Sequence, residues 1–310
     1  MRFAVNDAKV RAQSQTDMKS FRIQWLTQDN TLWEVDWLRH IFREKQDFID
    51  VEFEWEKIKT DENTILICNH AVPYRKVLDE LRQKGKRYGI VLLSDENLID
   101  PCEWLHDPNC VGLLRNYINP YLINHPKVTT FGLGCKVGLV KKLEDKEGPR
   151  ELIWSFAGTL HGGRGELIET MKTLEPFKVH KCSGFNAADG LSTEDYANLL
   201  KSSKYALCPP GQDSMDSFRL YEALEAGCIP VCLKNTGNWH IHPSYWHGVF
   251  FGEETLPFIH EDTWEQCLSE IKNIEQTDKY KQKQTECAAF WNKWKEKWQK
   301  DGSKLTEKLL

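Results

Sequence analysis

Strand-length apolar runs alternate with amphipathic stretches along most of this 310-residue chain, and this alternation limits the possible folds more than any other feature. TILICNH (64–70) and RYGIVLLSDEN (87–97) contain continuous apolar runs, which are typical of strands buried on both faces of a parallel sheet. The stretch between them, 75–84, reads as a helix that stops at Gly85. Repeated strand–helix–strand units of this kind predict an α/β fold.

The alternation occurs twice, because the charged segment KKLEDKEGPRE (141–151) interrupts it and has the composition of a linker. We therefore divide the chain into domains at 1–145 and 146–285, followed by a terminal helix at 286–310. Strands are expected at 21–26, 48–55, 64–70, 87–97, 110–117, 128–134, 152–160, 178–182, 205–211 and 228–233. Helices are expected at 36–46, 75–84, 164–175, 193–203 (capped by Ser192 or Thr193), 216–227 and over a long terminal region, 263–300.

Composition and charge exclude several classes of protein. A hydrophobic content of 40% is too high for a disordered chain. With 41 Lys and Arg against 46 Asp and Glu, no basic excess exists to neutralise phosphates, so we expect no nucleic-acid partner. The first residues, MRFAVNDAKVRAQSQTD, contain no long apolar run, and we expect neither a signal peptide nor a membrane span.

The ten cysteines form no CxxC motif, and several lie in apolar segments, as Cys68 and Cys208 do. Buried thiols of this kind behave as small apolar side chains. We expect reduced cysteines in a soluble, cytoplasmic protein, with a Cys102–Cys110 disulfide as the less favoured alternative.

The segment 205–233, YALCPPGQDSMDSFRLYEALEAGCIPVCL, is the most informative for chemistry. It reads as a strand, a polar loop, a helix and a second strand, and a helix N-terminus favours an anion. Arg219 suits a phosphate, and Glu222, three residues on, suits the two hydroxyls of a ribose. The pattern fits a nucleotide-diphosphate pocket at the carboxyl end of a parallel sheet, but a capped helix with a surface Arg–Glu pair fits almost as well.

This segment resembles the signature of exostosin-like glycosyltransferases, including their ribitol xylosyltransferase branch, in its P-x-G, S-x-R-x-x-E-A and G-C-I-P-V blocks. The resemblance extends over about 88–233, while the first 60 residues match no family pattern. Further matching blocks are Ser94-Asp95-Glu96, Leu114-Arg115-Asn116-Tyr117, Gly132-Leu133-Gly134, and Phe156-Ala157-Gly158 followed by Arg164.

The resemblance implies a GT-B fold, in which two Rossmann-like domains face a cleft and the last helix crosses back to the N-terminal domain. The N-terminal domain would bind the acceptor and the C-terminal domain the nucleotide sugar. Arg164 and Arg219 would bind the diphosphate, Glu222 the ribose, and the loop holding Gly211 and Ser214 or Ser217 would assist. No strict Asp-x-Asp motif occurs, so we expect neither a metal nor another cofactor.

An inverting transfer needs a general base that deprotonates the acceptor hydroxyl. Glu96 is our first candidate and Asp95 the second, since both follow the buried strand 87–97, although either could instead cap the next helix. His70 is the third, because histidine titrates near neutral pH. Arg115 and Trp239 are expected on the acceptor side of the cleft.

The resulting prediction is an inverting glycosyltransferase that uses a UDP-sugar, with UDP-xylose as the first guess, and a glycan or glycoprotein acceptor. A GDP-fucose-dependent, fucosyltransferase-like GT-B enzyme and an inactive carbohydrate-binding relative are the alternatives.

Tryptophan is frequent, with 12 copies, and the pattern separates two groups. Trp291, Trp294 and Trp298 form one helical stripe, which indicates packing. Trp239 and Trp246 lie in NWHIHPSYWH (238–247), where an aromatic loop could line a sugar cleft. A metal site at His240 and His242, or a plain core loop, remains open for this segment.

Overall fold

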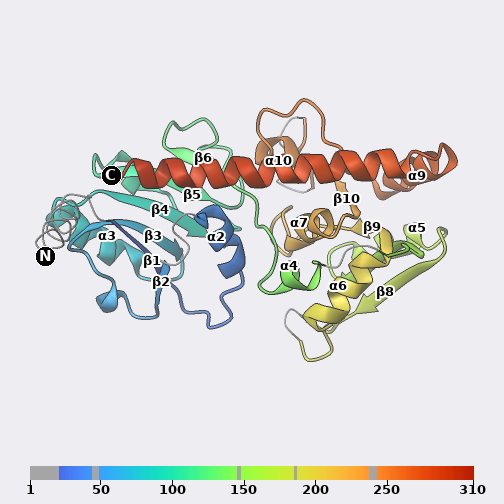
Figure 1. Ribbon diagram of the computed structural model, residues 1–310, viewed down its shortest axis with the longest axis horizontal. Helices are drawn as coiled ribbons and strands as arrows, with labels where there is room; N and C mark the ends of the chain where they lie inside the picture. Colours follow the sequence, from blue (N-terminus) through green and yellow to red (C-terminus); the bar gives the residue numbers. More distant parts are fainter. Residues whose placement is uncertain (1–20, 44–48, 145–147, 185–186, 237–242) are drawn as a thin grey trace, which may run out of the picture.

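The computed structural model describes residues 21–43, 49–144, 148–184, 187–236 and 243–310. Two separate sheets organise the chain, and every strand pairs with its neighbours in parallel. The first sheet has the order β2-β1-β3-β4-β5-β6 (Figure 1). Its strands are β1 (Phe21–Leu26), β2 (Ile49–Glu52), β3 (Asn63–Asn69), β4 (Tyr88–Leu93), β5 (Cys110–Arg115) and β6 (Val128–Thr130).

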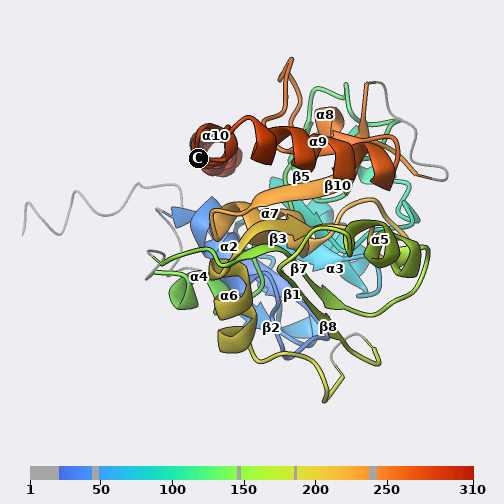
Figure 2. The same ribbon diagram turned by 90° about the vertical axis from the view of Figure 1, so that its right-hand side faces the viewer.

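The second sheet has the order β11-β10-β9-β7-β8. Helices α5 (Arg164–Met171) and α9 (Trp264–Gln276) cover one face of it, and α6 (Thr193–Lys201) and α7 (Phe218–Glu225) cover the other (Figure 2). The strands are β7 (Leu152–Gly158), β8 (Phe177–Lys181), β9 (Ser203–Leu207), β10 (Ile229–Leu233) and β11 (Ile259–Glu261). The predicted architecture of two parallel α/β sheets is confirmed.

We call the first sheet and the elements around it the first half, and the second sheet and its elements the second half. The longer helices of the first half are α2 (Val35–Ile41) and α3 (Tyr74–Gln83). Both agree with predicted helices, although α2 ends earlier than the expected 36–46. The expected cap of α6 is also present, since the Ser192 hydroxyl accepts a hydrogen bond from the Asp195 N–H.

Other elements differ from the sequence predictions. Strand β6 ends at Thr130 instead of continuing to 134. The terminal helical region is two helices, α9 and α10 (Tyr280–Glu307), because the chain turns between them and Asp278 adopts a left-handed φ of 52°. The predicted linker begins within the short helix α4 (Leu139–Lys142). Three further short helices were not predicted: η2 (Trp55–Lys57), η3 (Glu103–His106) and α8 (Tyr245–Val249).

Helix α10 extends along both sheets, from α9 at one end to the edge of the first sheet at the other (Figure 1). The three tryptophans of its stripe are buried, as predicted: Trp291, Trp294 and Trp298. Trp37 of α2 stacks on Trp291 at 5.7 Å between ring centres and meets Trp298 edge-on at 5.9 Å. Tyr221 of α7 contacts the same two indoles. One aromatic cluster therefore joins elements of both halves.

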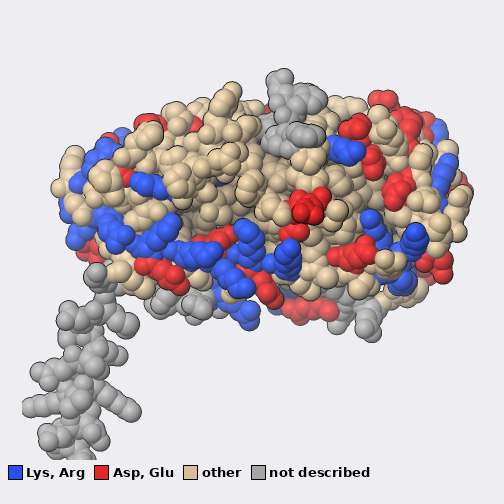
Figure 3. Space-filling model, turned by 90° about the horizontal axis from the view of Figure 1, so that it is seen from above, with Lys and Arg blue, Asp and Glu red and all other residues tan. Residues whose placement is uncertain are grey.

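Basic and acidic side chains are mixed on the face of the molecule that includes α10 (Figure 3). Lys293 pairs with Glu253 at 2.6 Å, and Lys297 and Lys304 both pair with Asp301, at 3.0 and 3.2 Å. Within the described ranges, no helix is both long and apolar enough to cross a bilayer.

All ten cysteines are free thiols, and nine of them are buried. The prediction of reduced core thiols is confirmed, and the alternative disulfide between Cys102 and Cys110 is not formed.

Candidate active site

The strand order of the second sheet reverses between β7 and β9, because β8 lies on one side of this pair and β10 and β11 lie on the other. The loops that follow two such strands leave in opposite directions and open a crevice at the carboxyl edge of the sheet. Arg164 lies at the end of the loop after β7, and Arg219 lies in the first turn of α7, after the loop that follows β9. The topology thus brings together two arginines that are 55 residues apart in the sequence.

Arg164 links the two loops of this crevice. Its Nη1 donates to the carbonyl and the hydroxyl of Thr159, at 3.1 and 3.2 Å, and its Nη2 donates to the carbonyl of Pro210 at 2.5 Å. Only 4% of the residue is exposed. Burial, together with the positive charge of Arg219, lowers the pKa of its guanidinium to about 10.

Arg219 lies over the end of β7. Its Nε donates to the carbonyl of Ala157 at 3.2 Å, and its guanidinium is 5.6 Å from the centre of the Phe156 ring. Gly158 permits this approach, since a Cβ atom there would be 2.5 Å from Nη2 of Arg219.

Throughout the described part of the chain, no carboxylate forms an ion pair with either arginine. His161 adds a third group, and its pKa is lowered by burial and then by the charges of Arg164 and Arg219. Because neither guanidinium is in an ion pair with a described residue, the two repel one another, and a bound phosphate would relieve this repulsion through charge-assisted hydrogen bonds.

The loop between β9 and α7 folds tightly back on itself. A Cβ atom on Gly211 would lie 2.8 Å from the carbonyl oxygen of Asp216, so glycine is required for this approach. The Ser214 hydroxyl accepts the Asp216 N–H at 3.1 Å, whereas Ser217 occupies the N-cap position without a side-chain capping bond. The hydroxyl of Ser217 is therefore not committed to the helix it precedes.

Two carboxyl groups near this loop are buried and bonded within the protein. The Asp216 carboxylate accepts the Tyr221 hydroxyl and the Ser217 N–H, both at 2.9 Å, and burial raises its pKa to about 7. Glu222 accepts the Lys136 N–H at 3.3 Å and the Tyr196 hydroxyl, and burial raises its pKa as well. Glu222, which was predicted to bind the ribose, is thus bonded to groups of the protein itself in this structure.

Glu96, which follows β4 of the first sheet, faces the loop between β9 and α7, called the donor-side loop below because Arg219, the predicted diphosphate ligand, follows it. Its Oε1 accepts the Tyr117 hydroxyl at 3.0 Å, and its carboxylate also accepts the backbone N–H of Asp213. The side chain is half-buried, and desolvation raises its pKa. Glu96 therefore connects the two halves at the carboxyl edges of both sheets.

The neighbouring candidates are placed differently. Asp95 is fully buried, where its Oδ2 pairs with Nη2 of Arg115 at 3.2 Å and its Oδ1 accepts the Ile99 N–H at 2.8 Å. Arg115 was expected at the cleft, but its side chain has no exposure and points to Asp95. His70 is one-third exposed, with Nδ1 3.9 Å from the Asp95 carboxylate. Asp95 closes a turn and caps no helix, which leaves Glu96 as the acidic side chain that faces the loop.

The aromatic loop predicted for the cleft is only partly described. Trp239, His240 and His242 lie outside the described residues. Trp246 was expected near the sugar, but this expectation is wrong: it is 1% exposed, and its Nε1 donates to the Leu233 carbonyl at 2.8 Å. Among the described residues, no three metal-ligating side chains cluster.

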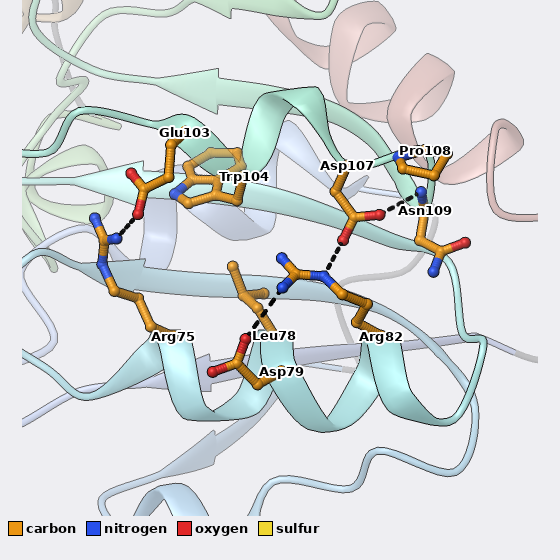
Figure 4. Close-up of a pocket in the computed structure, with 9 residues that line it drawn as sticks. All are labelled: Arg75, Leu78, Asp79, Arg82, Glu103, Trp104, Asp107, Pro108 and Asn109. Atoms are coloured by element: carbon orange, nitrogen blue, oxygen red, sulfur yellow. Dashed lines mark hydrogen bonds and ion pairs between the residues drawn. The ribbon is translucent and has the colours of Figure 1, made fainter.

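A cavity of about 480 Å³ lies away from these residues, between α3 and η3 of the first half (Figure 4). Its charged groups are matched within the cavity wall: Arg75 pairs with Glu103, and Arg82 pairs with Asp107 at 2.7 Å and Asp79 at 3.3 Å. No residue of the second half lines it. The convergence of Arg164, Arg219 and Glu96 defines the candidate site better than this cavity does.

The sequence motifs include Tyr117 but assign it no role, and they give neither the His161 nor the Asp216 side chain a function at the site. The contact of Tyr117 with Glu96 depends on the pairing of β4 with β5, which brings the ends of the two strands together. No local sequence pattern specifies this pairing.

The two sheets with their facing carboxyl edges define a GT-B fold. A solved α1,3-fucosyltransferase has a similar fold, with a TM-score of 0.50 and 11% identity, covering 87% of this chain and 82% of that chain. Residues 136–246 match the family model described as the Exostosin GT47 domain. These matches support the resemblance to exostosin-like glycosyltransferases that the motifs predicted.

Curated relatives agree with this assignment over limited segments. Exostosin-1 of Drosophila melanogaster is 38% identical over 80 residues, which cover 24% of this chain and 10% of that relative. Exostosin-1b of Danio rerio is 28% identical over 158 residues, which cover 41% of this chain and 21% of that relative. The chain therefore aligns with no more than about a fifth of either relative.

Proposed function

We propose that this protein transfers a sugar from a nucleotide-sugar donor to a hydroxyl of a glycan or glycoprotein acceptor, with inversion at the anomeric carbon. Arg164 and Arg219 converge at the switch point of the second sheet and form no ion pair among the described residues, and this observation carries the proposal. Glu96 belongs to the first half and bonds to the backbone N–H of Asp213 in the loop that precedes Arg219.

In the proposed reaction, the acceptor oxygen attacks the anomeric carbon while a Glu96 oxygen takes its proton. The bond from the sugar to the nucleoside diphosphate breaks, and the diphosphate leaves with the electron pair. Arg164 and Arg219 stabilise the negative charge that develops on this leaving group, so we propose that no metal is required. Desolvation raises the pKa of Glu96, which makes its carboxylate a stronger proton acceptor.

We propose a UDP-sugar as the donor and keep UDP-xylose as the first candidate, in line with the family motifs. The alternative is GDP-fucose. The free, mostly buried thiols support a reducing, cytoplasmic location for the protein.

Titration calorimetry with UDP and GDP tests the donor site in the absence of divalent metal. We expect UDP to bind more tightly than GDP, and Arg219→Gln to weaken UDP binding at least tenfold, since a charge-assisted hydrogen bond contributes about 1.5–3 kcal/mol. Arg82→Gln, an exposed arginine of α3, is the control and should keep the affinity of the unmodified protein.

Transfer is then measured with a panel of nucleotide sugars and glycan acceptors. Glu96→Gln should abolish transfer and leave UDP affinity intact, while Glu56→Gln, an exposed control, changes neither. Full turnover by the Glu96→Gln protein would refute the base assignment. Absence of binding to either nucleotide would instead favour an inactive carbohydrate-binding relative.

A further inference from the structure

Three consecutive residues after β4 are bonded to three consecutive residues at the end of β5. The Ser94 N–H donates to Oδ1 of Asn116 at 3.0 Å. Nη2 of Arg115 donates to Oδ2 of Asp95 at 3.2 Å, and the Tyr117 hydroxyl donates to Oε1 of Glu96 at 3.0 Å. We refer to these six residues as the β4–β5 clamp.

Arg115 occupies the centre of the clamp and has no solvent exposure. Besides its bond to Asp95, its Nε donates to the carbonyl of Tyr117 at 2.9 Å. The guanidinium therefore connects the residue that precedes Glu96 to the backbone that carries the Tyr117 phenol. A buried charge pair with this many bonds fixes both strand ends relative to each other.

The backbone of the clamp is held in an unusual conformation at two positions. Ser94 has a φ of 58° and Tyr117 a φ of 57°, in the left-handed region that non-glycine residues rarely adopt. Such conformations persist where the surrounding bonds determine them, and they cluster at functional sites. The bonds to Asn116 and Arg115 supply that restraint on either side of Glu96.

We propose that Tyr117 is a positioning residue for Glu96, and that the buried Arg115–Asp95 pair holds Tyr117 in place. This inference rests on the proposed function, in which Glu96 is the base. Tyr117 fixes one carboxylate oxygen from the acceptor side, while the backbone N–H of Asp213 holds the same carboxylate from the donor-side loop. The two motifs Ser94-Asp95-Glu96 and Arg115-Asn116-Tyr117 thus act as one unit, and Arg115 serves the base instead of contacting the acceptor.

The Tyr117 hydroxyl stabilises the charged form of Glu96, so its removal should raise the pKa of the carboxyl group further. In Tyr117→Phe we expect the acidic limb of the kcat/KM profile to move to higher pH by about one unit. We also expect kcat at neutral pH to fall about tenfold. The KM for the donor should stay unchanged, because Tyr117 lies on the acceptor side.

Tyr121→Phe is the matched control, since Tyr121 lies four residues further on and is 93% exposed. It should keep the pH profile of the unmodified enzyme. If Tyr117→Phe does not fold, 3-fluorotyrosine at this position replaces it, and its more acidic hydroxyl should move the acidic limb to lower pH.

The outcomes separate this inference from the proposed function. An inactive unmodified protein, or an active Glu96→Gln variant, would contradict the proposed function itself. If Glu96→Gln is inactive but Tyr117→Phe keeps the pH profile and kcat of Tyr121→Phe, Glu96 is the base and Tyr117 does not position it.

Discussion

At the scale of single residues, buried carboxyl groups make the stability of this protein depend on pH. Glu34, at the N-cap position of α2, is 8% exposed, and burial raises its pKa to about 7 from an ordinary value of 4.5. Burial raises the pKa of Asp216 to about 7 as well. Both groups hold a proton more tightly in the folded chain than in the unfolded one, so folding is favoured at the acidic end of this range.

The Glu34 carboxyl allows this expectation to be tested. The stabilising difference is complete below pH 4.5 and is lost as the pH rises through about 7, because the folded state must then hold a desolvated carboxylate. The shift corresponds to roughly 3 kcal/mol. Urea unfolding between pH 5 and 8 should show a smaller decline for Glu34→Gln than for the unmodified protein. The exposed Glu56→Gln should follow the unmodified protein, and equal slopes in all three would contradict the assignment.

At the scale of secondary-structure elements, close approach of backbones decides where α10 meets α2. A Cβ atom on Gly302 would lie 2.4 Å from the carbonyl oxygen of Ile41 and 2.8 Å from its Cγ2. Gly165, in α5, has nothing within 4 Å of such an atom. The two helical glycines therefore differ in packing but share the low helix propensity of glycine.

This contrast predicts opposite effects of the same substitution. Gly302→Ala should destabilise the protein by about 1–3 kcal/mol, because overpacking at Ile41 outweighs the gain in helix propensity. Gly165→Ala should stabilise it by about 0.5–1 kcal/mol. Chemical denaturation of the two variants under identical conditions measures both. Stabilisation by Gly302→Ala would contradict this prediction and show that α10 can move away from α2 without a loss of stability.

The sequence predicted most elements because their signals are local. Buried strands such as β3 and β4 have apolar runs, and α6 has a capping serine at Ser192. The site was predicted less completely. Arg164 and Arg219 followed from motifs, but the burial of Arg115 and Trp246 depends on which strands and loops pack against them. Contacts between residues far apart in the chain, such as Trp246 with Leu233, leave no periodic signal.

At the scale of the whole molecule, α10 is about 42 Å long at 28 residues and packs on both halves. Trp298 has no exposure and lies within the aromatic cluster that joins them. The centre of its ring lies 5.9 Å from the ring centre of Trp37 in the first half. It lies 6.3 and 5.7 Å from the ring centres of Tyr221 and Phe250 in the second half. Because Arg164 and Arg219 belong to one half and Glu96 to the other, this coupling also bears on how the candidate site is assembled.

We therefore expect the two halves to unfold as one cooperative unit and Trp298→Ala to weaken their coupling. The loss of a buried indole should cost about 3–5 kcal/mol. Differential scanning calorimetry should show one transition for the unmodified protein and a broadened or divided transition for Trp298→Ala. Phe53→Ala is the control, because Phe53 is 50% exposed and its loss should change stability by no more than about 0.5 kcal/mol. Two separate transitions in the unmodified protein, of which Trp298→Ala lowers only one, would show that α10 belongs energetically to a single half. In that case, contacts outside α10, such as those of Glu96 with Asp213 and of Lys136 with Glu222, would have to hold the halves together.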